Sequence, residues 1–250
     1  MADLLEVRDL SLQFGGITAL QGVGVAIAEG ETLAVIGPNG SGKTSLFNCV
    51  TGIYRPTSGA IRLRGESILG LSPDEVTRRG IARTFQNLRL FHNMTVLDNI
   101  MVGRHLHFRK NFAAVLLRLR GEEIRHRRRC EEIIEFLNLE VVRKSRVADC
   151  SYGLQKRVEI GRALATEPRL LLLDEPVSGL NQEEKDEFAY WIHEIRGRFA
   201  ITVLLVEHDL RIASRLATRM VALDHGVKIA EGSPAEVQRH PDVIKAYLGE

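Results

Sequence analysis

The sequence lacks several features that mark particular classes of protein. It has three cysteines, an odd number without metal-ligand spacing, so neither a disulfide framework nor a cysteine zinc site is expected. No apolar run approaches the roughly 18 residues that a membrane-spanning helix needs. The N-terminal residues also lack the basic region and following apolar segment of a secretory signal peptide. The 34 basic and 32 acidic residues leave a net charge of +2. A charge this small gives no indication that the protein binds nucleic acid or an anionic membrane. These absences predict a soluble, unexported protein with reduced thiols.

What is present is the composition of a chain that can bury a sizeable core. The 250 residues are 44% hydrophobic and 26% charged, which suits one large domain or two lobes. The first thirty residues alternate apolar and polar side chains, a pattern that predicts an antiparallel sheet exposed on one face. Two later runs, 169–176 and 201–209, are almost wholly apolar and end in acidic residues. They predict parallel strands buried on both faces, with functional groups at their carboxyl ends.

Helices are predicted between these strands. The segment 183–198 has the pattern of a crossover helix, and its Trp191 is expected in the core. Ser72 and Ser233 are each followed by a proline and then by a glutamate three residues on, the sequence of a capping box at a helix start. From about residue 94 to 150 the chain is rich in arginine and leucine and lacks the valine and isoleucine runs of buried strands. That stretch predicts an inserted helical lobe.

The strongest motif is GPNGSGKT, which lies between a predicted strand and a predicted helix. It satisfies the Gly, four residues, Gly-Lys-Ser/Thr pattern of the P-loop in the context that the motif requires. Glycines let backbone N–H groups curl around phosphate oxygens, Lys43 can reach the β- and γ-phosphates, and Thr44 can ligate Mg²⁺. The alternative, a glycine-rich turn with an incidental Gly-Lys-Thr, is disfavoured by the flanking elements. The predicted nucleotide-binding residues are Gly37, Pro38, Asn39, Gly40, Ser41, Gly42, Lys43 and Thr44.

Two adjacent carboxylates end the apolar run LLLLDEP. Asp174 at the strand end can hold the hydration shell of Mg²⁺, and Glu175 can polarise a water for attack on the γ-phosphate. Acidic residues at strand ends often only cap the following turn, and for this pair alone the two interpretations are equally good. Beside a P-loop, the catalytic interpretation prevails, and ATP with Mg²⁺ is the expected ligand pair.

With these motifs in order, the sequence resembles the nucleotide-binding subunit of ABC transporters along nearly its whole length. CSYGL at 150–154 takes the place of the family's LSGGQ signature; Ser151 and Gly153 match, whereas Cys150, Tyr152 and Leu154 depart. The resemblance implies that Ser151, Tyr152 and Gly153 contact the γ-phosphate bound by the opposite subunit, through a helix N-terminus. Taken alone, CSYGL would be an ordinary helix cap. Leu154 in place of glutamine leaves open how well this half-site supports hydrolysis.

Further positions follow from the same resemblance. Gln86 matches the glutamine that touches Mg²⁺ and couples the helical lobe to the nucleotide, and His208 matches the histidine that contacts the γ-phosphate. The segment 178–181 resembles the loop that crosses the dimer interface, with Asn181 in place of the usual aspartate. Phe14 falls where the family places a ring that stacks on adenine, although phenylalanine is also a common core residue.

The resemblance implies an α/β fold with a P-loop NTPase core and a mostly parallel sheet. Residues 1–250 would form a single ABC-type ATP-binding domain. Residues 1–93 and 158–250 would hold the core and an N-terminal antiparallel β subdomain, and residues 94–157 an inserted helical subdomain with the signature.

Several strings, among them 14–20, 80–105, 175–181 and 240–250, resemble the ATP-binding subunits of branched-chain amino acid importers. This implies an ATPase that pairs with a second ABC ATPase subunit, alike or different, and with two transmembrane permease subunits at the cytoplasmic face of the inner membrane. An extracytoplasmic substrate-binding protein would deliver the amino acid. Relatives serving import of urea, amides or aromatic acids, or lipid and lipopolysaccharide export, look similar. A non-transport ABC ATPase is the weaker alternative because heptad runs and a second P-loop are missing.

The helical lobe concentrates positive charge between His105 and Arg129. Glutamates interleave with the arginines, which favours a solvated helix face over contact with anionic headgroups.

Overall fold

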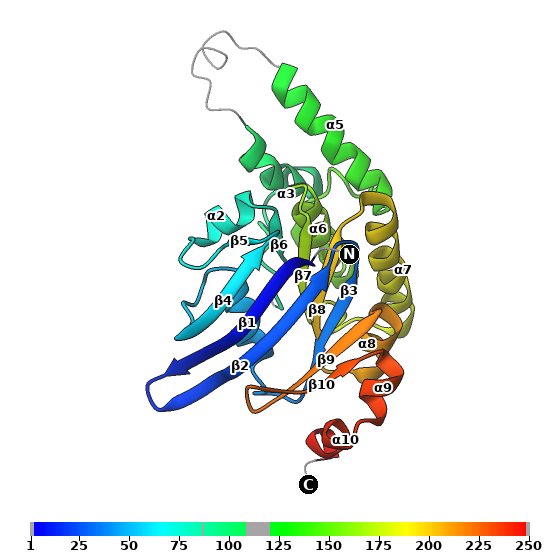
Figure 1. Cartoon of the computed structure of the whole chain (residues 1–250). Helices are drawn as coiled ribbons and strands as arrows, with labels where there is room; N and C mark the ends of the chain where they lie inside the picture. Colours follow the sequence, from blue (N-terminus) through cyan, green and yellow to red (C-terminus); the bar gives the residue numbers. More distant parts are fainter. Residues whose placement is uncertain (1–2, 87, 109–120, 249–250) are drawn as a thin grey trace. The chain divides into compact units, whose positions relative to one another are not determined.

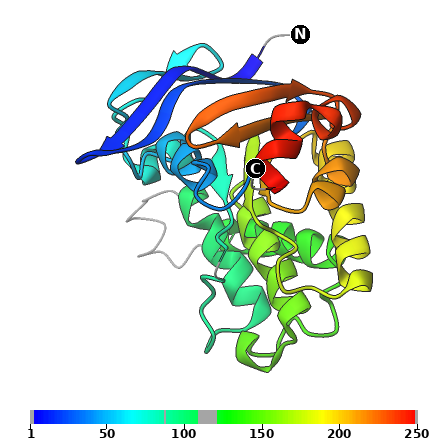
Figure 2. The same cartoon turned by 90° about the horizontal axis from the view of Figure 1, so that it is seen from below.

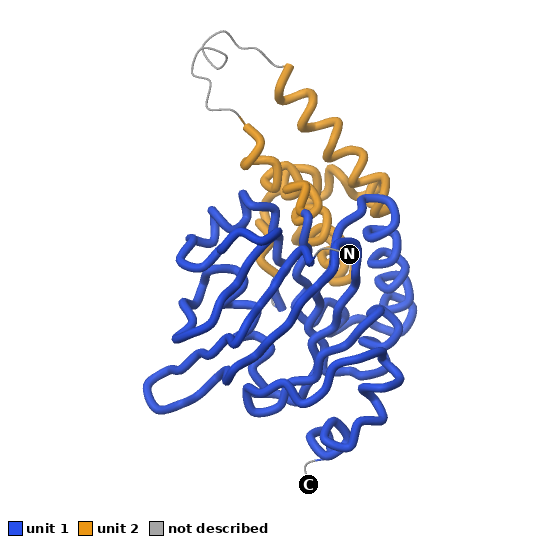
Figure 3. The backbone as a smooth tube through the Cα atoms, viewed as in Figure 1, with its two compact units in different colours: residues 1–86, 169–250 blue, residues 87–168 orange. Residues whose placement is uncertain are grey.

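A computed structural model of the chain describes residues 3–86, 88–108 and 121–248. The described residues divide into two compact units, one of residues 1–86 and 169–250 and the other of residues 87–168 (Figure 3). The predicted helical segment 94–157 falls inside the second unit. The finer subdomain boundaries stay a prediction.

The first unit contains an antiparallel sheet, as the alternating pattern predicts. Its strands lie in the order β2-β1-β4-β5 (Figure 1). Their bounds are β1 Asp3–Phe14, β2 Ile17–Ala28, β4 Ser58–Leu63 and β5 Glu66–Ser67.

A second sheet in this unit has the order β10-β9-β3-β8-β7-β6, and its pairs are parallel except for the β9–β10 hairpin. The bounds are β3 Thr32–Ile36, β6 Ile81–Arg83, β7 Leu170–Asp174, β8 Thr202–Glu207, β9 Arg219–Asp224 and β10 Val227–Gly232. Every residue of β3, β7 and β8 is buried, which explains why these strands are continuous apolar runs. The α/β fold class is therefore confirmed.

Helices connect these strands. They are α1 Lys43–Val50, α2 Pro73–Arg78, α7 Gln182–Phe199, α8 Leu210–Leu216, α9 Pro234–Arg239 and α10 Pro241–Leu248. The predicted capping boxes begin α2 and α9, each with proline in the first turn. Trp191 on α7 is buried, as expected. The two C-terminal helices pack beside the β9–β10 hairpin (Figure 2).

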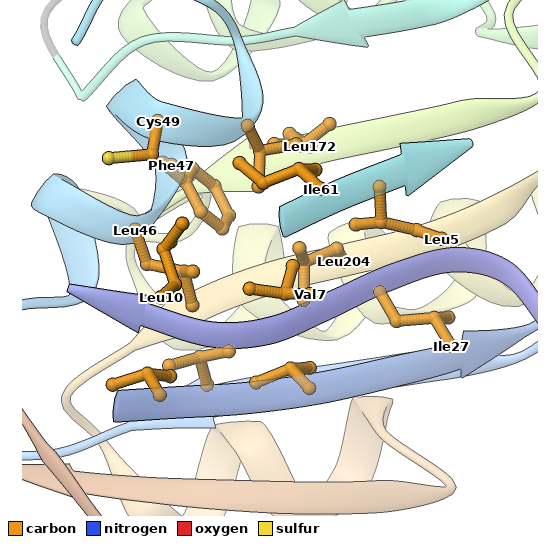
Figure 4. Close-up of a cluster of buried hydrophobic side chains, with 14 of the residues drawn as sticks. Leu5, Val7, Leu10, Ile27, Leu46, Phe47, Cys49, Ile61, Leu172 and Leu204 are labelled. Carbon is orange, nitrogen blue, oxygen red and sulfur yellow. The ribbon is translucent and has the colours of Figure 1, made fainter. Parts of the chain in front are cut away.

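Buried side chains from both sheets and from α1 gather in one cluster (Figure 4). Leu5 and Leu10 of β1 and Ile27 of β2 come from the antiparallel sheet, while Leu172 and Leu204 come from the parallel one. Burial of each such side chain stabilises the fold by roughly 1.5–3 kcal/mol. The antiparallel sheet is thereby fixed against the helix that follows the P-loop.

The second unit is helical, with α3 Val96–Gly103, η1 Arg104–His107, α5 Gly121–Phe136, η2 Val147–Asp149 and α6 Tyr152–Leu164. Part of the basic run falls on α5, where Arg129 Nη1 lies 2.8 Å from Glu132 Oε2. Residues 109–120 of that run lie outside the described residues, and its contact with lipid headgroups stays a hypothesis. Among the described residues, we find no helix with the length and apolar character that a membrane crossing requires.

Candidate nucleotide site

The parallel strands bring the predicted site residues to one edge of the sheet. Ile36 at the end of β3 pairs with Glu207 of β8, and Asp174 at the end of β7 pairs with Val206 of β8. The P-loop follows β3, Glu175 follows β7, and His208 follows β8. Segments that are far apart in the sequence therefore meet at the carboxyl ends of neighbouring strands, where α/β proteins hold their ligands.

Two P-loop glycines occupy positions that exclude a side chain. Gly37 has a φ of 148°, and a Cβ there would lie 2.1 Å from the Leu223 carbonyl oxygen. Gly42 has a φ of 103°, and a Cβ there would lie 2.7 Å from the Ala19 carbonyl oxygen. Because only glycine adopts these conformations without strain, the sequence forces a tight loop directly before α1.

Lys43 points back into this loop. Its Nζ donates to the carbonyl oxygens of Gly37 at 2.7 Å and Pro38 at 2.8 Å, and lies 3.3 Å from the Ser41 hydroxyl. Burial lowers the pKa of Lys43, while the carboxylates of Glu175, Asp174 and Glu207 oppose that shift. These contacts hold the ammonium at the P-loop, where its positive charge is available to a polyphosphate.

The start of α1 adds a second attraction for anions. Gly42 is the N-cap residue, and the first turn contains no acidic residue. Thr44 is exposed in that turn, as is Asn39 in the preceding loop, while Ser41 is buried. The free N–H groups and positive dipole end of the helix therefore face the region that the P-loop encloses.

Asp174 forms a buried ion pair that the sequence analysis missed. Its Oδ2 accepts from Arg83 Nη2 at 2.7 Å, and each side chain is only 7% exposed. Arg83 Nη1 also donates to Asn48 Oδ1 of α1 at 2.6 Å, so the arginine links β6 and β7 to the helix after the P-loop. The signal was an arginine in the three residues before Gln86, which apolar patterning alone does not single out.

Glu175 contacts Gln86 and His208, the residues that the resemblance assigned to Mg²⁺ and to the γ-phosphate. Its Oε2 accepts from Gln86 Nε2 at 2.8 Å, and its Oε1 lies 3.6 Å from His208 Nδ1. The Glu175 side chain is 14% exposed, whereas that of His208 is 52% exposed. The structure thus places a carboxylate, an amide and an imidazole together, an arrangement that can orient a water and accept its proton.

Glu207 is a further carboxyl group near the site, and the sequence analysis did not single it out. It is buried at the end of β8, and within the described residues its Oε1 has no hydrogen-bond partner. Burial raises the pKa of Glu207 to about 7. The signal was an acidic residue closing an apolar run, directly before His208.

Phe14 lies at the end of β1 with 45% of its surface exposed. Its ring stands edge-on to that of Tyr54, with centroids 5.0 Å apart and an interplanar angle of 76°. An exposed ring held by an aromatic neighbour suits stacking on a planar base.

The signature segment begins α6 in the second unit. Ser151 is the N-cap residue and accepts from the Leu154 N–H at 3.4 Å; Tyr152 is exposed and Gly153 is buried. In the first unit Asn181 caps α7 and accepts from the Glu184 N–H at 3.0 Å. Each motif therefore has a local structural role besides the predicted contact with another subunit.

Comparisons with known proteins agree with this geometry. Residues 20–178 match the family described as ABC transporter, and residues 227–250 match one described as branched-chain amino acid ATP-binding cassette transporter. The chain is 42% identical to the high-affinity branched-chain amino acid transport ATP-binding protein BraF of Pseudomonas aeruginosa, over 99% of this chain and 98% of that protein. It is 38% identical to the corresponding protein LivG of Escherichia coli over the same shares. The structure superposes on the crystal structure of an ATP-binding cassette of an ABC transporter in its ADP conformation. The match extends over 100% of each chain, with a TM-score of 0.88 and 30% sequence identity. The chain therefore belongs to the ABC transporter family, as an ATP-binding subunit with ATPase activity.

Proposed function

We propose that this chain uses Mg²⁺ in its ATPase reaction and couples ATP hydrolysis to the import of branched-chain amino acids. The observation that carries the catalytic part is the placement of Glu175 between Gln86 and His208 at the edge of the sheet that holds the P-loop. In this proposal Lys43, the P-loop N–H groups and the start of α1 bind the phosphates, and Phe14 stacks on the adenine.

The residues proposed for Mg²⁺ suit that ion. Mg²⁺ prefers oxygen ligands and is commonly held by one or two carboxylates together with substrate phosphates. The Thr44 hydroxyl, the Asp174 carboxylate and the Gln86 amide oxygen are such donors, and Asp174 is buried at the strand end. When bound, the ion would neutralise charge on the phosphates.

Glu175 is proposed as the general base for hydrolysis. Its carboxylate would take a proton from the attacking water, while His208 would hold that water and contact the γ-phosphate. In the structure, Gln86 donates to the Glu175 carboxylate. A change in the position of Gln86 would therefore break a hydrogen bond of the proposed base.

Ser151, Tyr152 and Gly153 are proposed to complete the site of a second subunit. The N-cap position of Ser151 leaves the first N–H groups of α6 at an exposed helix end, a suitable place for the γ-phosphate of the other chain. The partner would be another ABC ATPase subunit, alike or different.

The transport part of the proposal rests on the relatives. Both BraF and LivG are named as branched-chain amino acid transport ATP-binding proteins. By analogy, this chain would bind two transmembrane permease subunits as a peripheral protein at the cytoplasmic face of the inner membrane. An extracytoplasmic binding protein would supply the substrate.

Reconstitution tests the function. The chain would be placed in liposomes together with candidate permease subunits, a second ATPase subunit and a binding protein from the same genome. ATP-dependent uptake of labelled leucine would then be measured against urea and an aromatic amino acid. We expect leucine uptake that a Lys43→Ala chain does not support. Uptake of urea instead of leucine would overturn the substrate, and uptake with Lys43→Ala at the wild-type rate would overturn the ATP site.

A further inference from the structure

The first glycine of the P-loop is held by a residue from the far end of the chain. The Gly37 N–H donates to the hydroxyl of Tyr247 on α10, at 2.9 Å and across 210 positions of sequence. Gly37 is buried, and its N–H lies just beyond the last residue of β3. A buried backbone N–H without a partner is costly, so the tyrosine hydroxyl meets a requirement of the loop itself.

Both polar groups of Gly37 are therefore occupied by side chains. Tyr247 accepts from its N–H, and Lys43 donates to its carbonyl oxygen at 2.7 Å. The N–H belongs to the peptide bond before Gly37 and the carbonyl oxygen to the peptide bond after it. The conformation of Gly37 therefore links the tyrosine to Lys43, whose ammonium is the cation proposed to face the phosphates.

The P-loop also contacts the C-terminal part of the chain at Ser41, near the other end of the loop. The Gly226 N–H, in the turn between β9 and β10, donates to the Ser41 carbonyl oxygen at 3.1 Å. The P-loop, this turn and α10 also line a cavity of about 470 Å³, with Asn39, His225 and Lys245 among its walls. Besides sharing this cavity, the loop and α10 are joined directly by the hydrogen bond from the Gly37 N–H to the Tyr247 hydroxyl.

α10 is anchored well enough to act as a support. Val243 on this helix is buried, and the helix packs on both α9 and β10. Burial raises the pKa of Tyr247 to about 12, so the phenol stays neutral and its hydroxyl keeps its proton over the range in which enzymes work.

We propose that Tyr247 is a positioning residue for the nucleotide, which holds the peptide bond before Gly37, and with it the start of the P-loop, in the orientation that the loop needs to bind phosphates. The C-terminal helix is then part of the nucleotide site through this hydrogen bond. The inference rests on the proposed ATP site and adds to it a residue outside the P-loop, the acidic strand end and the signature.

The test is Tyr247→Phe in the full chain, which removes one oxygen atom and keeps the ring. We expect MgATP and ADP to bind three- to tenfold more weakly, as for loss of one hydrogen bond. The KM for ATP would rise by the same factor, while kcat at saturating ATP stays within about twofold, since Glu175 and His208 are untouched. Amide hydrogen exchange of the peptide that contains Gly37 would become faster.

Tyr190→Phe is the matched control because Tyr190 is 56% exposed on α7. It should change neither affinity nor exchange. A variant that merely lost stability would show a lower apparent kcat with an unchanged KM. Wild-type affinity for ATP and ADP in Tyr247→Phe would overturn the role of Tyr247. Failure of the wild-type chain to bind ATP, or normal binding by Lys43→Ala, would instead overturn the proposed ATP site.

Discussion

Glu175 shows how a single residue is placed for chemistry. Its φ is 45°, a left-handed conformation that non-glycine residues seldom adopt and that costs of order 1–3 kcal/mol. The turn at this position directs the carboxylate toward Gln86 and His208. We expect Glu175→Gln to keep the affinity for ATP and to lower kcat by a factor of about 10² to 10⁴, because the amide cannot accept the proton.

Phosphate release under saturating ATP measures this effect. Glu183→Gln provides the control, since Glu183 is exposed in the first turn of α7. Turnover of Glu175→Gln at the wild-type rate would remove Glu175 as the base.

Arg83 compensates the charge of Asp174. Because both side chains are 7% exposed, removal of the guanidinium leaves a buried carboxylate without its partner. We expect Arg83→Met to lower the free energy of unfolding by about 3–5 kcal/mol, as for broken buried ion pairs. Urea unfolding of this variant, of Asp174→Asn and of the double variant measures the coupling between the two side chains.

The double variant should be more stable than the sum of the two single losses predicts, by about 0.5–3 kcal/mol. Arg55→Met, at an exposed position, should leave stability nearly unchanged. Additive losses at Arg83 and Asp174 would show that the ion pair does not couple them.

Glu207 predicts a pH dependence of stability. Burial raises its pKa from 4.5 to about 7, so the folded protein binds this proton more tightly than the unfolded chain does. The stabilisation is complete below pH 4.5 and is lost as the pH rises to about 7 and above. Relative to Glu207→Gln, which does not titrate, the wild type should lose on the order of 3 kcal/mol over that interval.

Urea unfolding of both proteins at pH 5 and pH 8 gives the difference. A stability difference between wild type and Glu207→Gln that is equal at the two pH values would contradict the raised pKa.

At the scale of elements, the sequence predicted those with strong local signals. The apolar runs gave β7 and β8, the capping boxes gave the starts of α2 and α9, and alternation gave β1 and β2. These signals are local because burial on one or both faces, and unpaired N–H groups at a helix start, constrain consecutive residues.

Other features had no local signal. β6 has three residues, Ile81–Arg83, too few to show a period, and it is a strand because it pairs with β7. Within the site, the P-loop and its neighbours were predicted in order, but the partners Arg83 and Tyr247 were not. Their roles come from contacts across 91 and 210 positions of sequence, which only the folded chain brings together.

The packing of α3 on α6 depends on a glycine. A Cβ on Gly103, the last residue of α3, would lie 2.2 Å from the Arg162 carbonyl oxygen and 2.8 Å from the Ala165 Cβ. We expect Gly103→Ala to push the two helices apart and to lower the free energy of unfolding by about 1–3 kcal/mol. Thermal or urea unfolding measures the loss.

Gly197→Ala on α7 is the matched control because a Cβ there meets no atom within 4 Å. It should raise stability by about 0.5–1 kcal/mol, as alanine favours a helix over glycine. The same sign of change in both variants would rule out the helix contact as the cause.

At the scale of the whole molecule, the two sets of residues proposed to bind the γ-phosphate lie on separate compact units. The P-loop, Glu175 and His208 belong to the first unit, and the signature residues Ser151 and Gly153 belong to the second. If each γ-phosphate is bound by the P-loop of one subunit and the signature of another, ATP holds two subunits together. Hydrolysis would then remove this link and let the two subunits separate.

This arrangement predicts an ATP-dependent dimer. Because Glu175→Gln is expected to bind ATP and to cleave it far more slowly, the purified variant with ATP should elute at twice the 28.0 kDa of the single chain. Without ATP it should elute at the mass of one chain. Adding Ser151→Arg to the same chain should abolish the dimer, because the larger side chain at the α6 N-cap would fill the place proposed for the γ-phosphate of the other subunit. Lys43 and the P-loop of each chain should still bind ATP. Light scattering after gel filtration gives the mass, and bound nucleotide is counted in the same fractions. Glu175→Gln that stays a single chain with ATP bound would show that a second copy of this chain does not complete its site.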